Sequence, residues 1–398
     1  MRSRSSLAFR GGLGAAWSWF AAFVGGMLWI ASQAADPLAF WPILLATLGL
    51  GLLLAVDRHA YLAEALAGAG RESVLLLAAA WPLAAILAQT LRLSGLPASL
   101  VNIAEPLGLV GMPYVLAAFV LVATASVVGG SALAALALVA PLLYVTGDAL
   151  GVATAPLAGA LLAGAAFGDH LSPIAEVSVA AAITQRPNLA QLAATRLSWA
   201  LAPGLASAVA FALLVPNPPP PNSLPSGDPR ALLLLAAPAL ALWILRRRRH
   251  LVEATAFGAA AAVSIALLAD RLTVDELLRF EGARLDGGLL DAAEQGAELS
   301  IVLVSIAAVM RVARSAGLPQ SFFRLLRPRH PARAPRRRDE ARLVLAMFGG
   351  TAMTVHPSGA ALALGDEMRH TGRLTAVPAL RRAHLLEVTI RALPFLLP

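Results

Sequence analysis

Residues 161–181 read LLAGAAFGDHLSPIAEVSVAA, an apolar run that carries two carboxylates, Asp169 and Glu176. A lone ionised carboxylate costs several kcal/mol at membrane depth, so it persists there when it pairs, takes up a proton or binds a cation. No arginine occurs between Leu93 and Gln185 to pair with either group. The run therefore predicts a membrane segment whose carboxylates alternate between a proton and a metal cation.

The same stretch contains residues that interrupt a helix. Pro173 has no backbone N–H to donate, and Gly168 weakens the helix before it. An interrupted membrane helix leaves free carbonyls and amides, which are tolerated where they line a cavity and where transporters bind ions. Ser172 and Ser178 add neutral oxygens, and His170 adds an imidazole. We therefore expect Asp169 and Glu176 to bind Na⁺ or H⁺, with Ser172 and Ser178 beside them and His170 as a proton or substrate contact.

The composition places this stretch in a membrane protein. Of the 398 residues, 58% are hydrophobic and 14% are charged, and the mean hydropathy is +0.73. Soluble domains carry about 25% charged residues, so an ordinary soluble enzyme is excluded. The chain has no cysteine, and all 31 of its basic residues other than histidine are arginine. Thiolate metal sites, cysteine nucleophiles and a Walker A loop, which needs Gly-Lys, are therefore excluded as well.

Apolar runs and arginine clusters predict the topology. We expect spans near residues 14–32, 38–55, 73–89, 232–245, 251–269 and 299–310, and an amphipathic segment outside the membrane at 270–294. The N-terminus, the Arg246–Arg249 cluster and the loop at 311–342, with ten arginines, fall on one side under this count. Arginine-rich loops face the cytoplasm. We expect a multi-pass protein of the inner membrane with a cytoplasmic N-terminus, and the clustering argues against a nucleic-acid partner.

The domain organisation follows from a proline-rich segment. Residues 216–230 include four consecutive prolines and predict an extended, extracytoplasmic linker between residues 1–215 and 231–398. We expect an all-α polytopic membrane protein with about 10–12 membrane segments in two inverted halves, with broken helices and re-entrant hairpins.

The segment from Phe167 to Glu176 resembles the NhaC-type Na⁺/H⁺ antiporter family, whose signature reads Gly-Asp-x-x-Ser-Pro-[Leu/Ile]-Ser-Asp-Thr-Thr. The signature matches at five positions, namely Gly168, Asp169, Ser172, Pro173 and Ile174. Residues 123–130, ATASVVGG, look like the family's hydroxyl-rich loop, which adds Thr124 and Ser126 to the expected site. The resemblance implies Na⁺/H⁺ exchange. Glu176 replaces the family's second Asp, and several hydroxyls are lost, which leaves the identity of the coupling ion open.

The second half contains a similar interruption. Residues 347–359 read MFGGTAMTVHPSG, and the resemblance places them opposite the first break. Thr354 and His356 are candidate proton or substrate contacts, and Pro357 is a candidate helix breaker. Glu387 is a further candidate contact, four residues before Arg391. Compared with the family, the chain looks short and divergent at its C-terminus.

Three functions compete at this point. The first is exchange of Na⁺ for H⁺ at the carboxylate pair, with no cofactor and with lipid and small cations as partners. A homodimer is compatible with the sequence. The second is cation-coupled transport of a small organic acid or amino acid on the same fold, against which the lack of an arginine near the site counts. The third is a polytopic membrane enzyme, but no protease or metal motif accompanies Asp169.

Overall fold

The computed structural model describes residues 7–33, 36–172, 174–187, 189–215, 227–248, 250–281, 284–321, 337–351 and 357–392. These residues form two compact units that are interleaved along the chain. Unit 1 comprises Met1–Ala78, Glu176–Ala194 and Glu298–Pro398, and unit 2 comprises Ala79–Ala175 and Thr195–Ala297. The units therefore do not coincide with the predicted sequence halves, and the inverted relation between those halves stays a prediction.

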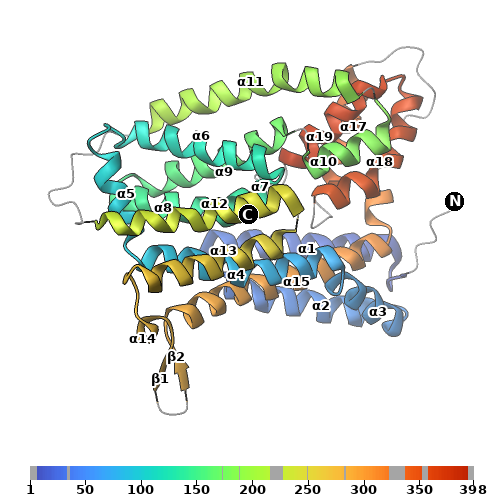
Figure 1. Ribbon diagram of the computed structural model, residues 1–398. Helices are drawn as coiled ribbons and strands as arrows, with labels where there is room; N and C mark the ends of the chain where they lie inside the picture. Colours follow the sequence, from blue (N-terminus) through green and yellow to red (C-terminus); the bar gives the residue numbers. More distant parts are fainter. Residues whose placement is uncertain are drawn as a thin grey trace. The chain divides into compact units, whose positions relative to one another are not determined.

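The named elements of unit 1 are all helices (Figure 1), and an isolated antiparallel bridge joins Phe9 to Ala55. Its own elements are α1 (Gly12–Gln33), η1 (Pro37–Phe40), α2 (Trp41–Leu54), α3 (Arg58–Ala69), α10 (Glu176–Gln185), α17 (Arg337–Thr351), α18 (Pro357–Leu374) and α19 (Ala379–Ala392). Its core has two clusters. One joins α1, α2 and α3 to the end of α15 (Gly288–Ser315), and the other joins α10 to α17, α18 and α19.

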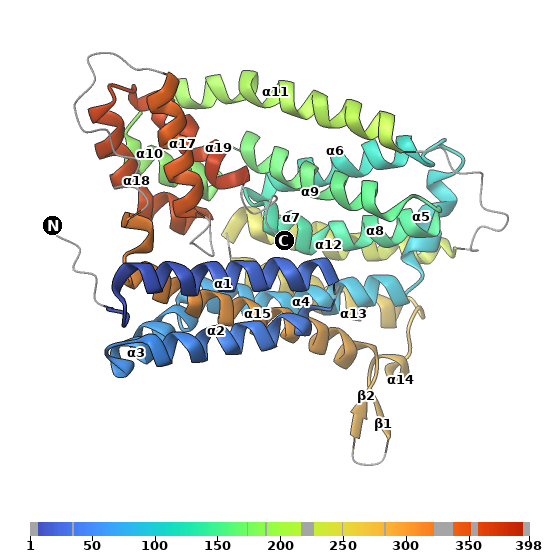
Figure 2. The same ribbon diagram turned by 180° about the vertical axis from the view of Figure 1, so that it is seen from behind.

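Unit 2 consists of helices and one small hairpin (Figure 2). Its first helices are α5 (Leu96–Ala104), α6 (Met112–Gly129), α7 (Ala132–Leu138), α8 (Ala140–Ala149) and α9 (Thr154–Leu171). The later ones are η2 (Pro229–Leu235), α12 (Ala236–Arg248), α13 (Leu251–Leu268) and α14 (Val274–Leu277). Three long helices run through both units, namely α4 (Glu72–Leu93), α11 (Leu189–Leu214) and α15.

Seven helical segments among the described residues are long and apolar enough to cross a membrane. They are Gly12–Gln33, Pro37–Leu54, Glu72–Leu93, Met112–Gly129, Pro229–Arg247, Leu251–Leu268 and Gly288–Ser315. The pair α7 and α8, bent by 48°, makes an eighth if it is one span. The prediction of an all-α polytopic membrane protein is confirmed, while the number of segments beyond these eight stays a prediction.

Two predicted segments have other bounds in the structure. The segment at 270–294 contains α14, then the antiparallel pair β1 (Arg279–Glu281) and β2 (Arg284–Asp286), then the start of α15, and its side of the membrane stays a prediction. The loop predicted at 311–342 is shorter, because α15 continues to Ser315 and α17 begins at Arg337. The arginines at both ends of that loop are therefore helical residues.

Close packing of α6 against α9 positions the break that follows α9. A Cβ added at Gly164 would lie 2.5 Å from the Phe119 carbonyl oxygen, and one at Gly168 would overlap the Ala123 carbonyl oxygen. The two backbones approach this closely only because these positions lack a side chain. The prediction that Gly168 breaks the helix is wrong, since α9 continues through it to Leu171.

Candidate functional site

Asp169 lies in the last turn of α9, where its side chain is buried within unit 2. Two residues further on, the helix stops at Leu171. This turn packs against α6, where Gly168 lies against Ala123 and Ser126. A carboxylate at this position stands beside the carbonyl end of a helix, where the helix dipole favours a cation.

The hydroxyls predicted for the site are used to fasten α9 to α6. Ser126 donates a hydrogen bond to the Ala165 carbonyl at 2.8 Å, and Ser172 donates one to the Val127 carbonyl at 2.9 Å. Each oxygen keeps its lone pairs, so both hydroxyls still have the chemistry of a cation ligand. Thr124 is different: it is exposed and donates to the Val120 carbonyl one turn back in α6.

The interruption expected near Pro173 coincides with a gap between two helices. Ser172 ends α9 by donating its N–H to the Gly168 carbonyl at 2.9 Å, and α10 begins at Glu176. Ala175 donates its N–H to the Ser172 carbonyl at 3.4 Å. Gly130, which has a positive φ of 71°, lies against Ile174. Pro173 itself lies outside the described residues.

A basic residue lies at this break, contrary to the expectation that the site lacks an arginine. Arg196 of α11 is 5% exposed, and its Nη1 donates a hydrogen bond to the Ser172 carbonyl at 3.4 Å. Arg196 follows Asp169 by 27 residues and lies two helices further along the chain, so the spacing of charges in the sequence did not predict the contact. A buried guanidinium adds one positive charge next to the end of the helix that carries Asp169.

Apart from His170, the remaining predicted ligands belong to unit 1. Ser178 is buried in α10, and Glu387 is buried in α19. Glu176 is the first residue of α10, and its side chain lies outside the described part, so the carboxylate pair stays a prediction. Thr354 and His356 also lie outside the described residues. His170 lies in the last turn of α9 in unit 2 and is half-buried.

A second buried arginine ties α10 to the C-terminal helices. Arg382 of α19 donates through Nε to the Oε1 of Gln185 at 3.2 Å and through Nη1 to the Val377 carbonyl. Gln185 in turn donates to the Gly365 carbonyl of α18 at 2.8 Å. Burial, with repulsion from Arg373 and Arg369, lowers the pKa of Arg382. Arg382 therefore stabilises the turn between α18 and α19. At its other end, α18 starts at Pro357.

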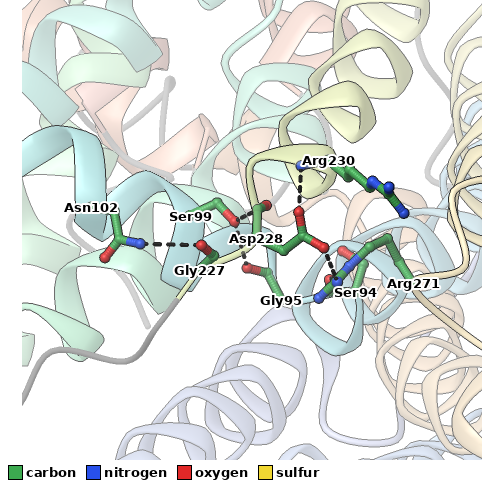
Figure 3. Close-up of polar contacts among 8 residues, drawn as sticks. All are labelled: Ser94, Gly95, Ser99, Asn102, Gly227, Asp228, Arg230 and Arg271. Carbon is green, nitrogen blue, oxygen red and sulfur yellow. Dashed lines mark hydrogen bonds and ion pairs between the residues drawn. The ribbon is translucent and has the colours of Figure 1, made fainter.

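A third arginine serves another helix end in unit 2 (Figure 3). Arg271 donates to the Ser94 carbonyl, just after α4, at 3.1 Å and forms an ion pair with Asp228 at 2.8 Å. The backbone of the same segment is held by α5, because Ser99 donates to the Asp228 carbonyl at 2.8 Å and Asn102 donates to the Gly227 carbonyl at 3.3 Å. The pair is partly exposed, with 24% of the Arg271 side chain and 38% of the Asp228 side chain accessible.

Together, the residues around the end of α9 can bind a small cation or exchange it for a proton. They offer one buried carboxylate, two serine oxygens and the carbonyls of an interrupted helix, all of which are hard ligands that suit Na⁺. Within the described ranges, no three histidine, aspartate or glutamate side chains form a metal-binding group.

Residues 18–215 match the model of the Na⁺/H⁺ antiporter family. The match covers α6, α9, the break and Arg196, so the part of the chain that carries the candidate site is similar to that family. No match was found among proteins of curated function. With its candidate membrane-spanning helices, this similarity points to a multi-pass membrane protein of the transporter type.

Proposed function

We propose that the protein exchanges Na⁺ for H⁺ across the cytoplasmic membrane, with cation and proton competing for Asp169 and Glu176. The observation that carries this proposal is the buried carboxylate of Asp169 in the last turn of α9, directly before the interruption. Sodium would bind the deprotonated carboxylate, and protonation would release it. Ser126 and Ser172 would contribute oxygen ligands, and no cofactor is needed.

The location of these groups suits exchange better than permanent binding. The helix end supplies partial negative charge from its carbonyls, which favours a cation. Arg196 donates a hydrogen bond to the Ser172 carbonyl at the break. Its positive charge opposes the partial negative charge of the helix end, so the bound cation is held less tightly. A site that binds Na⁺ weakly can release it when a proton arrives. We propose that the N-terminus faces the cytoplasm, which puts the arginine-rich ends of the spans on that side.

The test is sodium-driven proton movement in everted membrane vesicles. Addition of Na⁺ to vesicles with an acidic interior is expected to collapse the pH gradient. Asp169→Asn and Glu176→Gln are each expected to reduce the response to that of vesicles lacking the protein. Asp148→Asn, an exposed carboxylate on α8 of the same unit, is the matched control and keeps wild-type activity. A wild type inert to Na⁺, Li⁺ and K⁺ from about pH 6 to 9 would refute exchange.

A second function is favoured by one observation. Anionic substrates usually need a basic residue or helix N-termini at their site, and Arg196 supplies a buried guanidinium at the break. This would suit cation-coupled uptake of a small carboxylate. Uptake of labelled succinate or lactate that Na⁺ stimulates, and that Arg196→Gln abolishes while Arg186→Gln leaves it intact, would favour this function over simple exchange.

A further inference from the structure

A cavity of about 260 Å³ lies at the end of α1 in unit 1. Its walls come from the segment before α1, from the first turns of α1 and from the residues after α15, with Ala8, Phe9, Leu13 and Ala316 among the lining side chains. The lining is apolar at the side chains, and Phe9 and Ala316 belong to the same buried cluster. The cavity is smaller than sites for drug-sized ligands, which have volumes of about 300–1,000 Å³. It can hold part of one aliphatic chain.

The cavity lies next to the ends of two candidate spans. One candidate span begins at Gly12 and another ends at Ser315, and residues next to both points line the cavity. The Gly12 N–H is bonded to the Phe9 carbonyl at 2.8 Å, and the Gly317 N–H to the Arg314 carbonyl at 3.0 Å. The ends of membrane spans lie at the depth of the lipid headgroups. A ligand in this cavity is therefore within reach of the bilayer.

Arginines gather around the same ends. Arg71 and Arg311 lie close enough to Arg314 for their charges to repel it. Arg311 is neutralised by Glu64 at 2.7 Å, and Ser315 donates to the same carboxylate oxygen. The described residues provide no ion pair to Arg71 or Arg314. Within the part of the chain that the structure describes, these two guanidiniums have no acidic partner, and Arg10, which follows the cavity-lining Phe9 in the sequence, adds a third charge.

The position of this cluster is fixed by close packing. A Cβ at Gly68 of α3 would lie 2.5 Å from the Arg311 Cβ and 2.6 Å from the Ala307 carbonyl oxygen. Glycine at this position lets α3 lie directly on α15, so Glu64 reaches Arg311 and Ser315. Positive charges near an apolar cavity at the ends of two candidate spans complement a molecule that has both an anion and an acyl chain.

We infer that this cavity and the arginines Arg10, Arg71 and Arg314 form a binding site for an anionic phospholipid. One acyl chain would enter between the segment before α1 and the end of α15, and the phosphate would bind the guanidiniums. Arginine suits this role because its planar fork binds phosphate oxygens in pairs. The site lies in unit 1 and is independent of Asp169.

The experiment measures thermal unfolding of the purified full-length protein in non-ionic detergent. Dioleoyl phosphatidylglycerol is expected to raise the melting temperature by several degrees, and dioleoyl phosphatidylcholine is expected to leave it unchanged. Glycerol 3-phosphate, which has the anion without the chains, is also expected to have no effect. A stabilisation by glycerol 3-phosphate equal to that by the lipid, or none by phosphatidylglycerol, would overturn the proposal.

Variants separate the headgroup from the chain. Arg314→Gln and Arg71→Gln are expected to lose most of the shift caused by phosphatidylglycerol, while Arg279→Gln, an exposed arginine of the hairpin in unit 2, keeps it. Ala8→Trp places a ring in the cavity from an exposed position and is expected to reduce the shift without lowering the melting temperature in lipid-free detergent. Retention of the full shift in Arg314→Gln, or in Ala8→Trp, would contradict the site.

Discussion

The break after α9 and the turn after α18 each end a helix against a buried arginine, yet they are built differently. After α18, the N–H groups of Thr375, Ala376 and Val377 all bond back to carbonyls of the helix, at 2.9–3.2 Å. After α9, the described backbone contributes the Ser172 N–H at 2.9 Å and the longer Ala175 N–H bond at 3.4 Å. The comparison indicates that the turn after α18 is a closed structural joint, whereas we propose that the break after α9 is where a ligand binds.

The arginines at these two helix ends differ in the same way. Arg382 has two bonds that join α19 to α10 and to the turn. Arg196 has a long bond of 3.4 Å to the Ser172 carbonyl, close to the turn that carries Asp169. We therefore expect Arg382 to act on stability and Arg196 to act on ion binding.

The largest effect is expected from Gly168→Ala, which disrupts the close packing of α9 on α6 just before the break. The added Cβ would overlap the Ala123 carbonyl and lie 2.7 Å from the Ser126 Cβ. Forcing α6 and α9 apart is expected to cost about 1–3 kcal/mol of the free energy of unfolding and to abolish exchange. Gly14→Ala in α1, where a Cβ meets nothing within 4 Å, is the control and keeps both. Thermal unfolding and vesicle exchange measure the two effects.

Arg382→Gln is the next test, because it removes the joint after α18. The Val377 carbonyl and Gln185 lose their donor, and an unpaired buried polar group costs about 1–3 kcal/mol. The melting temperature falls, but the Na⁺ concentration for half-maximal exchange in the folded fraction stays the same. Arg381→Gln, whose side chain is 51% exposed, is the matched control. A changed Na⁺ concentration for half-maximal exchange would contradict the view that Arg382 acts on stability alone.

Arg196→Gln is expected to show the opposite pattern. Removing a positive charge from the break strengthens Na⁺ binding, so the half-maximal Na⁺ concentration falls about threefold to tenfold, or by about 0.6–1.4 kcal/mol. Stability changes less than in Arg382→Gln. Arg186→Gln, an exposed arginine near α10, serves as control. A rise in the half-maximal concentration would mean that Arg196 holds the site together instead of weakening it.

The smallest effect is expected at Arg271, which serves the end of α4 from a partly exposed position. A double-mutant cycle of Arg271→Gln and Asp228→Asn is expected to give a coupling of at most about 1 kcal/mol, since exposed pairs contribute little. Salt should reduce it further. A coupling above about 2 kcal/mol would show that partial exposure does not make Arg271 less important than the buried arginines Arg196 and Arg382.

The sequence predicted those features that depend on residues close together in the chain. Apolar runs predicted α1, α2, α4 and α13 to within a few residues, because a span needs a continuous apolar stretch. Pro173 predicted where α9 stops. The contact of Arg196 with the Ser172 carbonyl could not be predicted, because it depends on how α11 packs on α9. The same holds for Gly168, whose neighbours Ala123 and Ser126 come from another helix. The hairpin at β1 and β2 was missed because both strands are three residues long.

The central claim is that Na⁺ and H⁺ compete for Asp169, and proton release on sodium binding tests it most directly. Purified protein in weakly buffered detergent solution would be mixed with NaCl, and the pH change would be recorded. The account predicts that the wild type releases protons and that Asp169→Asn releases none, while Asp148→Asn behaves as the wild type. Sodium binding without proton release, or the same release from Asp169→Asn, would contradict the account.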